Sequence, residues 1–245
     1  MIKISSVSYL NSLPFIYGIK ESDLYSEIEL FLDPPSLCAD KLIKDEIDIG
    51  LVPVVTLHSL KNYKILSEYC IGSEGVVDTV CVFSNVPINQ VKTILLDPQS
   101  RTSVELLKIL LKNHWGINPV LYSEKIDLEL ENNNSAALVI GDDAFPLHNK
   151  FEFVYDLSLE WSTMTGMPFV FAVWVTNKNL NPNFIQKFNQ ALDFGVRNIN
   201  KSLSISNVSH EIFVKDPLKY LNSRISYNFD ENKKKAMNFF LSQVS

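Results

Sequence analysis

The sequence lacks the features of a membrane or exported protein. Among its 245 residues no apolar run reaches roughly 18 residues, so no membrane-spanning helix is expected. No internal repeat, low-complexity tract or linker rich in glycine and serine is visible. Polar Ser5, Ser6 and Ser8 interrupt the first apolar stretch almost at once, which differs from a secretory leader. We therefore expect a cytoplasmic protein that does not bind a membrane.

Cysteine and positive charge are also scarce. Cys38, Cys70 and Cys81 are odd in number and have no CxxC spacing, which predicts reduced, buried thiols and argues against a disulfide framework or a zinc site. The net charge is −6. Residues 1–86 carry 6 basic and 12 acidic groups, and residues 87–170 carry 6 and 11, so a nucleic-acid partner is not expected.

The first 53 residues alternate between strand and helix patterns. Strands are expected at 2–6, 28–32 and 48–52, with helices after Pro14 and from Pro35 to Ile43. Such an alternation predicts a parallel sheet with crossover helices, and hence an α/β fold. Ligands of open α/β sheets bind where strands end, so Ser8, Tyr9 and Asn11 are candidate site residues together with Pro53. The alternative is that the polar residues among them only form turns.

A strand, a tight turn and a helix follow one another between residues 93 and 111. Thr102 and Glu105 have the spacing of a capping box, which predicts a helix start at about Thr102. The free amides of this helix end, with the hydroxyls of Ser100, Thr102 and Ser103, would suit an anion. Arg101, the only arginine before Arg197, lies in the same turn. The alternative is an ordinary capped helix with an exposed arginine.

The middle of the chain repeats the α/β pattern. Strands are expected at 120–122, 136–140 and 153–156, with a polar helical stretch that extends to Asn134. Gly141 would let the backbone approach a ligand, and Asp142 is either a site residue or a helix cap. Trp161, Phe169 and Phe171, in and before the apolar strand 169–175, are large enough to wall a pocket, and we predict Phe169 as the site residue among them. The alternative for Phe169 is plain core packing.

The order of these elements predicts two lobes. A chain of this length suits two units of about 120 residues. We expect lobe 1 to comprise residues 1–86 and 172–245, with a strand at 77–83, and lobe 2 to be inserted as residues 87–171. Each lobe would hold a mixed, mainly parallel sheet flanked by helices, and a ligand cleft would lie between them. This is the architecture of a type II periplasmic-binding-protein-like fold, whose ligand is a small anion.

Five blocks together resemble the chorismate dehydratases of the futalosine route to menaquinone. The resemblance covers residues 2 to about 176, and the blocks are VSYLNSLP (7–14), DIGLVP (48–53), LDPQSRTSVELLK (95–108), ALVIGD (137–142) and TGMPFVFAVW (165–174). One block departs from the family. Where the family commonly has a serine before an apolar strand, this chain has Thr79.

The resemblance implies an enzyme that removes water from chorismate, a dianion, and forms 3-[(1-carboxyvinyl)oxy]benzoate. Formation of the aromatic ring drives the reaction, so no metal or redox cofactor is expected. The turn at 100–103 would take one carboxylate, while Asn11 and Thr79 would hold the other reacting groups. The side-chain carboxylate of chorismate would serve as the base, with Asp142 or Glu74 as the alternative. Rival functions are a 1,4-dihydroxy-6-naphthoate synthase-like enzyme of the same pathway and a non-catalytic protein that binds a small anionic solute.

Overall fold

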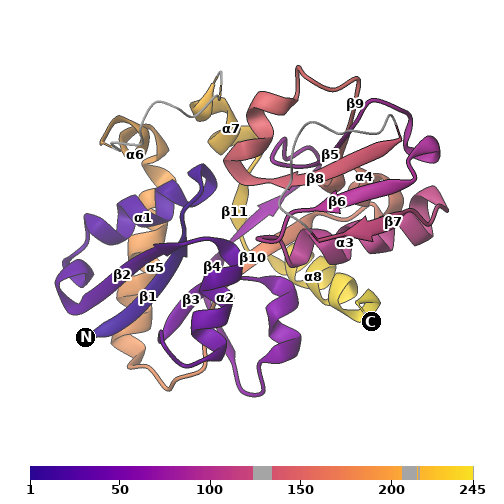
Figure 1. Cartoon of the computed structure of the whole chain (residues 1–245). Helices are drawn as coiled ribbons and strands as arrows, with labels where there is room; N and C mark the ends of the chain where they lie inside the picture. Colours follow the sequence, from indigo (N-terminus) through magenta and orange to yellow (C-terminus); the bar gives the residue numbers. More distant parts are fainter. Residues whose placement is uncertain (124–133, 206–213, 215, 245) are drawn as a thin grey trace.

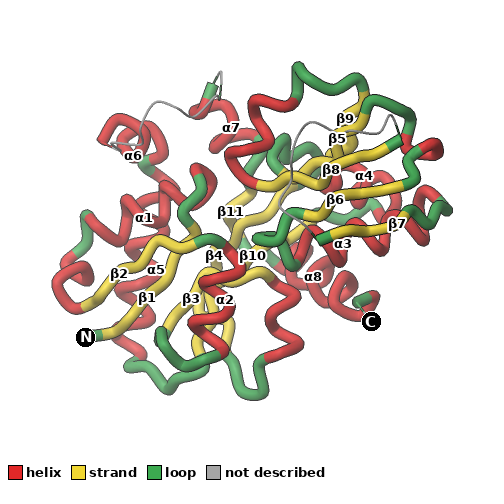
Figure 2. Tube along the Cα trace, viewed as in Figure 1, coloured by secondary structure: helices red, strands yellow, loops and turns green. Residues whose placement is uncertain are grey.

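The protein folds into two α/β lobes, each built on its own sheet (Figure 1). The structure, a computed structural model, describes residues 1–123, 134–205, 214 and 216–244. Figure 2 shows the two sheets as separate groups of strands with helices packed around each. The expected helical stretch before Asn134 lies largely outside the described residues. In the part of the chain that the structure describes, no helix is long and apolar enough to cross a membrane. The cytoplasmic location stays a prediction.

The sheet of lobe 1 has six strands in the order β11-β4-β10-β3-β1-β2. The strands are β1 (Ile2–Val7), β2 (Ile28–Asp33), β3 (Ile49–Pro53), β4 (Lys64–Ser73), β10 (Phe169–Thr176) and β11 (Ser226–Asn228). β1 pairs in parallel with β2 and β3, which confirms the arrangement predicted for the first 53 residues. β10 returns from lobe 2 and runs antiparallel between β3 and β4. The sequence analysis did not predict β4 or β11.

Helices cover this sheet and fix the loop that leads to the site. They are α1 (Leu13–Lys20), α2 (Pro35–Ile43), α5 (Pro182–Arg197), α6 (Ile199–Ile205) and α7 (Pro217–Ser223), with short 3-10 turns η1 (Leu10–Ser12), η2 (Asp23–Glu27) and η3 (Val54–Ser59). α1 meets α5 backbone to backbone, because a Cβ on Gly18 would lie 1.9 Å from the carbonyl oxygen of Ala191. A Cβ on Gly195 would lie equally close to the carbonyl oxygen of Pro14. This contact holds α1, and therefore η1 before it, against the lobe.

The sheet of lobe 2 has five strands in the order β7-β6-β8-β5-β9. They are β5 (Val80–Ser84), β6 (Thr93–Leu96), β7 (Val120–Tyr122), β8 (Ser135–Ile140) and β9 (Phe153–Asp156). β6 is parallel to β7 and β8, whereas β5 is antiparallel to β8 and β9. The helices are α3 (Thr102–Leu110), which continues as the turn η5 (Leu111–Trp115), α4 (Leu157–Thr165), and the 3-10 turns η4 (Ile88–Gln90) and η6 (Gly141–Leu147).

The predicted place of the first crossing between the lobes is wrong. β5 belongs to the sheet of lobe 2, so the chain crosses before Val80 and not after it. All five residues of β5 are buried, and β8 and β9 pair with its two edges. The Asp156 carboxylate accepts hydrogen bonds from the amides of Val77 and Asp78 (2.8 and 2.7 Å) and so fixes the turn that redirects the chain. The return also begins earlier than predicted, because Phe169 already pairs with Ser73.

The C-terminal helix α8 (Glu231–Gln243) contacts both lobes, although the sequence analysis assigned it to lobe 1. It packs against β10, and Figure 1 shows it below lobe 2. The ring of Phe240 lies edge-on to Trp161 of α4 and to Phe169 of β10, with centroids 5.9 and 5.0 Å apart. An aromatic cluster therefore joins the lobes behind the cleft.

Candidate active site

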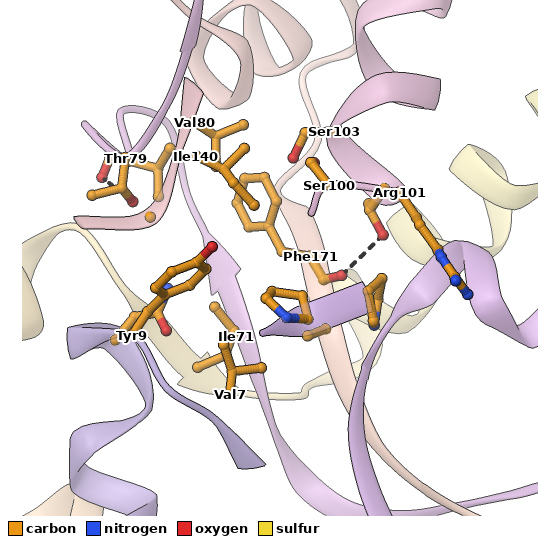
Figure 3. Close-up of a pocket in the computed structure, with 17 residues that line it drawn as sticks. Val7, Tyr9, Ile71, Thr79, Val80, Ser100, Arg101, Ser103, Ile140 and Phe171 are labelled. Carbon is orange, nitrogen blue, oxygen red and sulfur yellow. Dashed lines mark hydrogen bonds between the residues drawn. The ribbon is translucent and has the colours of Figure 1, made fainter. Parts of the chain in front are cut away.

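A cavity lies between the lobes, as the two-lobed arrangement predicts. Its empty volume, open solvent at the mouth included, is about 560 Å³. Seventeen residues line it (Figure 3). Nine of them are predicted site residues: Tyr9, Asn11, Pro53, Thr79, Ser100, Arg101, Thr102, Ser103 and Gly141. The other eight are Val7, Pro35, Ile71, Val77, Val80, Ile140, Phe171 and Ala172.

One end of the cavity is the turn at residues 100–103, which we call the serine turn. It follows β6, and Asp97 shapes it by accepting hydrogen bonds from the amides of Gln99 (2.9 Å) and Ser100 (3.1 Å). α3 begins at Thr102 as predicted, so its first amides have no carbonyl in a preceding turn. Within the described residues the hydroxyls of Ser100 and Ser103 have no hydrogen-bond partner. This end offers donors to an anion.

The predicted capping box does not form. Arg101 occupies the cap position without a side-chain cap, and Thr102 is already the first helical residue. The Thr102 hydroxyl donates to the carbonyl of Phe171 in β10, 3.2 Å away. Glu105 pairs instead with Lys108, at 2.8 Å. Thr102 therefore ties α3 of lobe 2 to the strand that returns to lobe 1.

Arg101 spans the cleft and does not point into the cavity. Its guanidinium donates to the carboxylate of Asp40 on α2 of lobe 1, at 2.6 Å. Figure 3 shows the side chain extending away from Ser103 and Phe171. Both partners are partly exposed to solvent. The ion pair is thus a contact between the closed lobes, and the anion donors of this end are the amides and hydroxyls around it.

The opposite end is the Asn11–Thr79 corner. Thr79 is 1% exposed, and its hydroxyl lies 2.9 Å from the hydroxyl of Tyr220 on α7. The backbone carbonyl of Asn11 accepts a hydrogen bond from Tyr227 of β11, at 2.9 Å. The side-chain oxygen of Asn11 is buried and has no hydrogen-bond partner among the described residues. A buried acceptor of this kind is costly unless a ligand pairs with it.

Tyr9 and Gly141 form the contact between η1 and η6 across the cleft. The Tyr9 hydroxyl donates to the side-chain oxygen of Gln99, at 2.9 Å. Burial, with the nearby charges of Asp97 and its acidic neighbours, raises the pKa of Tyr9, so the phenol keeps its proton. Gly141 has a φ of 66°, and a Cβ there would lie 2.7 Å from the Tyr9 ring. Only glycine permits this approach.

Asp142 closes the lobes but does not line the cavity. Its two oxygens accept the Leu10 amide at 3.2 and 3.0 Å, so the prediction that it faces the ligand is wrong in this closed form. Burial is the main cause that raises the pKa of Asp142 from 3.8 to about 6. The hydrogen bond from Leu10 lowers the pKa, and the charge of Asp143 raises it further. The carboxylate is thus desolvated by lobe contact.

Three other candidates also lie outside the cavity. Ser8 is exposed, and its amide donates to the carbonyl of Asp33 (3.0 Å), which continues the pairing of β1 with β2. Phe169 is 1% exposed and packs in the aromatic cluster behind the cleft, while Phe171 lines the cavity. Glu74 forms an ion pair with Lys233 (2.7 Å), which holds its pKa below the usual range, and lines a separate hollow.

The lining residues missed by sequence reasoning are apolar. Ile71, Ile140 and Ala172 are examples, and they lie on β4, β8 and β10. Their types do not distinguish a pocket wall from core. No aspartate, glutamate, histidine or lysine is among the seventeen described lining residues. The cavity therefore provides hydrogen-bond donors, an amide and an apolar wall.

Two lobes, two passages of the chain between them and a cavity at their junction define the class of periplasmic-binding-protein-like folds. A Candida albicans protein described as having the generic periplasmic-binding-protein fold has a TM-score of 0.65 and 13% identity, over 100% of this chain and 90% of that one. A crystal structure from Archaeoglobus fulgidus has a TM-score of 0.75 and 17% identity, over 99% of this chain and 96% of that one. These likenesses confirm the predicted fold class.

Residues 2–245 match the sequence model of the menaquinone biosynthesis family, and the chain belongs to that family. A relative from Thermus thermophilus, named chorismate dehydratase, is 30% identical over 155 residues. That alignment spans 55% of this chain and 57% of the relative. The family resemblance drawn from the sequence blocks is therefore confirmed.

Proposed function

We propose that this protein is a chorismate dehydratase, which converts chorismate to 3-[(1-carboxyvinyl)oxy]benzoate and water. The observation that carries the proposal is the cavity between the lobes, with anion donors at one end and an amide and a hydroxyl at the other. Family membership and the relative named chorismate dehydratase support the same reaction. The substrate is a small dianion, and its two charges suit a site with donors at separated points.

The ring carboxylate is assigned to the serine turn. Removing the proton at C3 pushes charge toward this carboxylate through the conjugated ring, so donors placed there stabilise the developing dienolate. A partly buried charge at a helix N-terminus gains up to ~2 kcal/mol, besides direct hydrogen bonds. The unpartnered hydroxyls of Ser100 and Ser103 support this assignment.

The departing C4 hydroxyl and the ether carboxylate are assigned to the Asn11–Thr79 corner. The C3–H bond breaks, its electron pair forms the new ring double bond, and the C4–O bond breaks. The proton and the hydroxide leave together as water, so the reaction balances within the substrate. Asn11 and Thr79 hold these groups in line, and the desolvated cavity favours a single reactive conformation.

The base is the side-chain carboxylate of chorismate itself. The absence of a carboxylate, histidine or lysine among the described lining residues supports this choice, because serine, threonine and asparagine are poor bases at neutral pH. Asp142 is the remaining alternative on the protein. It would need to leave its hydrogen bond with Leu10 before it could reach a ligand.

Incubation of the purified protein with chorismate tests the proposal. We expect loss of chorismate and appearance of one product that is lighter by one water and has the absorbance of an aromatic ring. Binding of chorismate without any conversion would contradict the dehydratase assignment and favour a solute-binding role. Conversion of a later pathway intermediate, with chorismate untouched, would favour the naphthoate synthase-like reaction instead.

A further inference from the structure

Two buried tyrosines of the C-terminal segment support the Asn11–Thr79 corner from behind. Tyr220 lies on α7 and Tyr227 on β11; they are 4% and 5% exposed. The Tyr220 hydroxyl meets the hydroxyl of Thr79 at 2.9 Å, and the Tyr227 hydroxyl donates to the backbone carbonyl of Asn11 at 2.9 Å. Neither tyrosine lines the cavity. They therefore contact the site residues and not the ligand.

Packing holds the Tyr220 ring in one orientation. It lies edge-on to Phe145 of η6, with centroids 5.0 Å apart. Burial raises the pKa of Tyr220, and hydrogen bonding with Thr79 and with the Asn11 side chain acts in the opposite direction. The phenol therefore keeps its proton at neutral pH. The Tyr220 hydroxyl is thus held against the hydroxyl of Thr79.

The role of Tyr220 depends on which group accepts the proton of the Thr79 hydroxyl. When the Tyr220 hydroxyl donates to the Thr79 oxygen, the proton of Thr79 must go elsewhere. The only other recorded partner of that hydroxyl among the described residues is the carbonyl of Val77, which at 3.4 Å is at the weak limit of hydrogen bonding. In that arrangement the Thr79 proton is available to a group in the cavity.

We infer that Tyr220 is a positioning residue, which directs the Thr79 hydroxyl as a donor toward the departing group of the substrate. This inference rests on the proposed function and deepens it. It also gives the C-terminal segment a part in the site, although none of the five sequence blocks lies in that segment. Tyr227 supports Asn11 in a similar way. Its hydroxyl binds the backbone carbonyl of Asn11, however, and so does not orient a side-chain hydroxyl.

Kinetics of Tyr220→Phe test the inference, because this change removes the hydroxyl and keeps the ring. Losing one neutral hydrogen bond that acts in the transition state lowers kcat about 10-fold. KM should stay within about twofold, since Tyr220 does not touch the ligand. A kcat within about twofold of wild type would overturn the inference.

A double variant separates positioning from general support. If Tyr220 acts through Thr79, Tyr220→Phe should cost nothing further in a Thr79→Ala background, and it should keep its full effect in a Thr79→Ser background. An equal loss in the Thr79→Ala background would show a merely structural role and overturn the inference. Tyr155→Phe is the matched control, because the Tyr155 hydroxyl accepts the amide of Ile88 (2.8 Å) away from the cavity.

A crystal structure of Tyr220→Phe keeps this test independent of the proposed activity. We expect the Thr79 hydroxyl to turn toward the Val77 carbonyl once its donor is gone. An unmoved Thr79 side chain would overturn the inference, whatever the activity of the wild-type protein. Failure of the wild-type protein to convert chorismate would refute the dehydratase function and would leave the structural result unaffected.

Discussion

The serine turn and the Asn11–Thr79 corner hold opposite ends of one cavity, and the chain builds them in different ways. The serine turn is four consecutive residues at the start of α3, so local geometry alone brings its donors together. The corner joins residues 11 and 79, and Tyr220 supports it through its contact with Thr79. Local geometry therefore suffices to build the proposed anion site, whereas the proposed site of the departing group requires three distant segments.

The largest expected effect is at the corner. Thr79→Val and Asn11→Ala should each lower kcat about 100-fold or more, in line with the loss of a donor placed for the transition state. KM should change less, because the serine turn still binds the carboxylate. Thr79→Ser is the control, since it retains the hydroxyl. Near-normal kcat in both variants would remove the corner from the mechanism.

The serine turn should affect binding more than turnover. Ser103→Ala removes one hydroxyl donor to a charged group, worth about 1.5–3 kcal/mol, so KM should rise at least about 10-fold. The kcat should fall less than for the corner variants. Ser26→Ala, which removes an exposed hydroxyl bound to the carbonyl of Asp23, is the control. An unchanged KM would place the anion elsewhere in the cavity.

Gly141→Ala tests the contact that brings the two ends together. The added Cβ would meet the Tyr9 ring at 2.7 Å, so the lobes could not close as they do here. We expect chorismate affinity to fall several-fold, roughly the effect of 1 kcal/mol. Gly116→Ala is matched, because Gly116 has a φ of 65° and open space around it. Equal losses in both variants would point to backbone strain and not to closure.

We expect Arg101 to affect chorismate binding only through its ion pair with Asp40, which holds the two lobes together. A partly exposed ion pair contributes about 0.2–1 kcal/mol, so Arg101→Gln should weaken chorismate binding less than about fivefold. Asp40→Asn should have the same small effect, because it breaks the same pair. A much larger loss in Arg101→Gln than in Asp40→Asn would show that the guanidinium binds the substrate directly.

The smallest effect concerns pH. The pKa of Asp142 is about 6 in the closed, folded protein and near 3.8 when the group is exposed, so the folded state binds the extra proton. Stability should therefore fall as pH rises from about 4 to about 6 and level off above that. Asp142→Asn should remove this part of the slope in thermal unfolding midpoints measured across the range. An identical slope in the wild-type protein and in Asp142→Asn would contradict the predicted contribution of Asp142 to the pH dependence of stability.

The alternating strands and helices, the start of α3 at Thr102 and the free helix end at the serine turn could all be predicted from the sequence. These features depend on the periodicity of apolar residues and on contacts between residues within one turn of each other, and both can be read from a short stretch of sequence. The same reasoning failed for the capping box, because the Thr102 hydroxyl has a better partner in Phe171 of another lobe.

Tertiary contacts, in contrast, determine where β5 pairs, that Asp142 closes the lobes, and that Phe171 and not Phe169 lines the cavity. Each outcome depends on which distant segment covers a residue: β8 and β9 for β5, Leu10 for Asp142, and α8 for Phe169. Tyr220 is the clearest case. No motif near Tyr220 in the sequence indicates a site. Its partner Thr79 lies 141 residues away, and the two residues come into contact only in the folded protein.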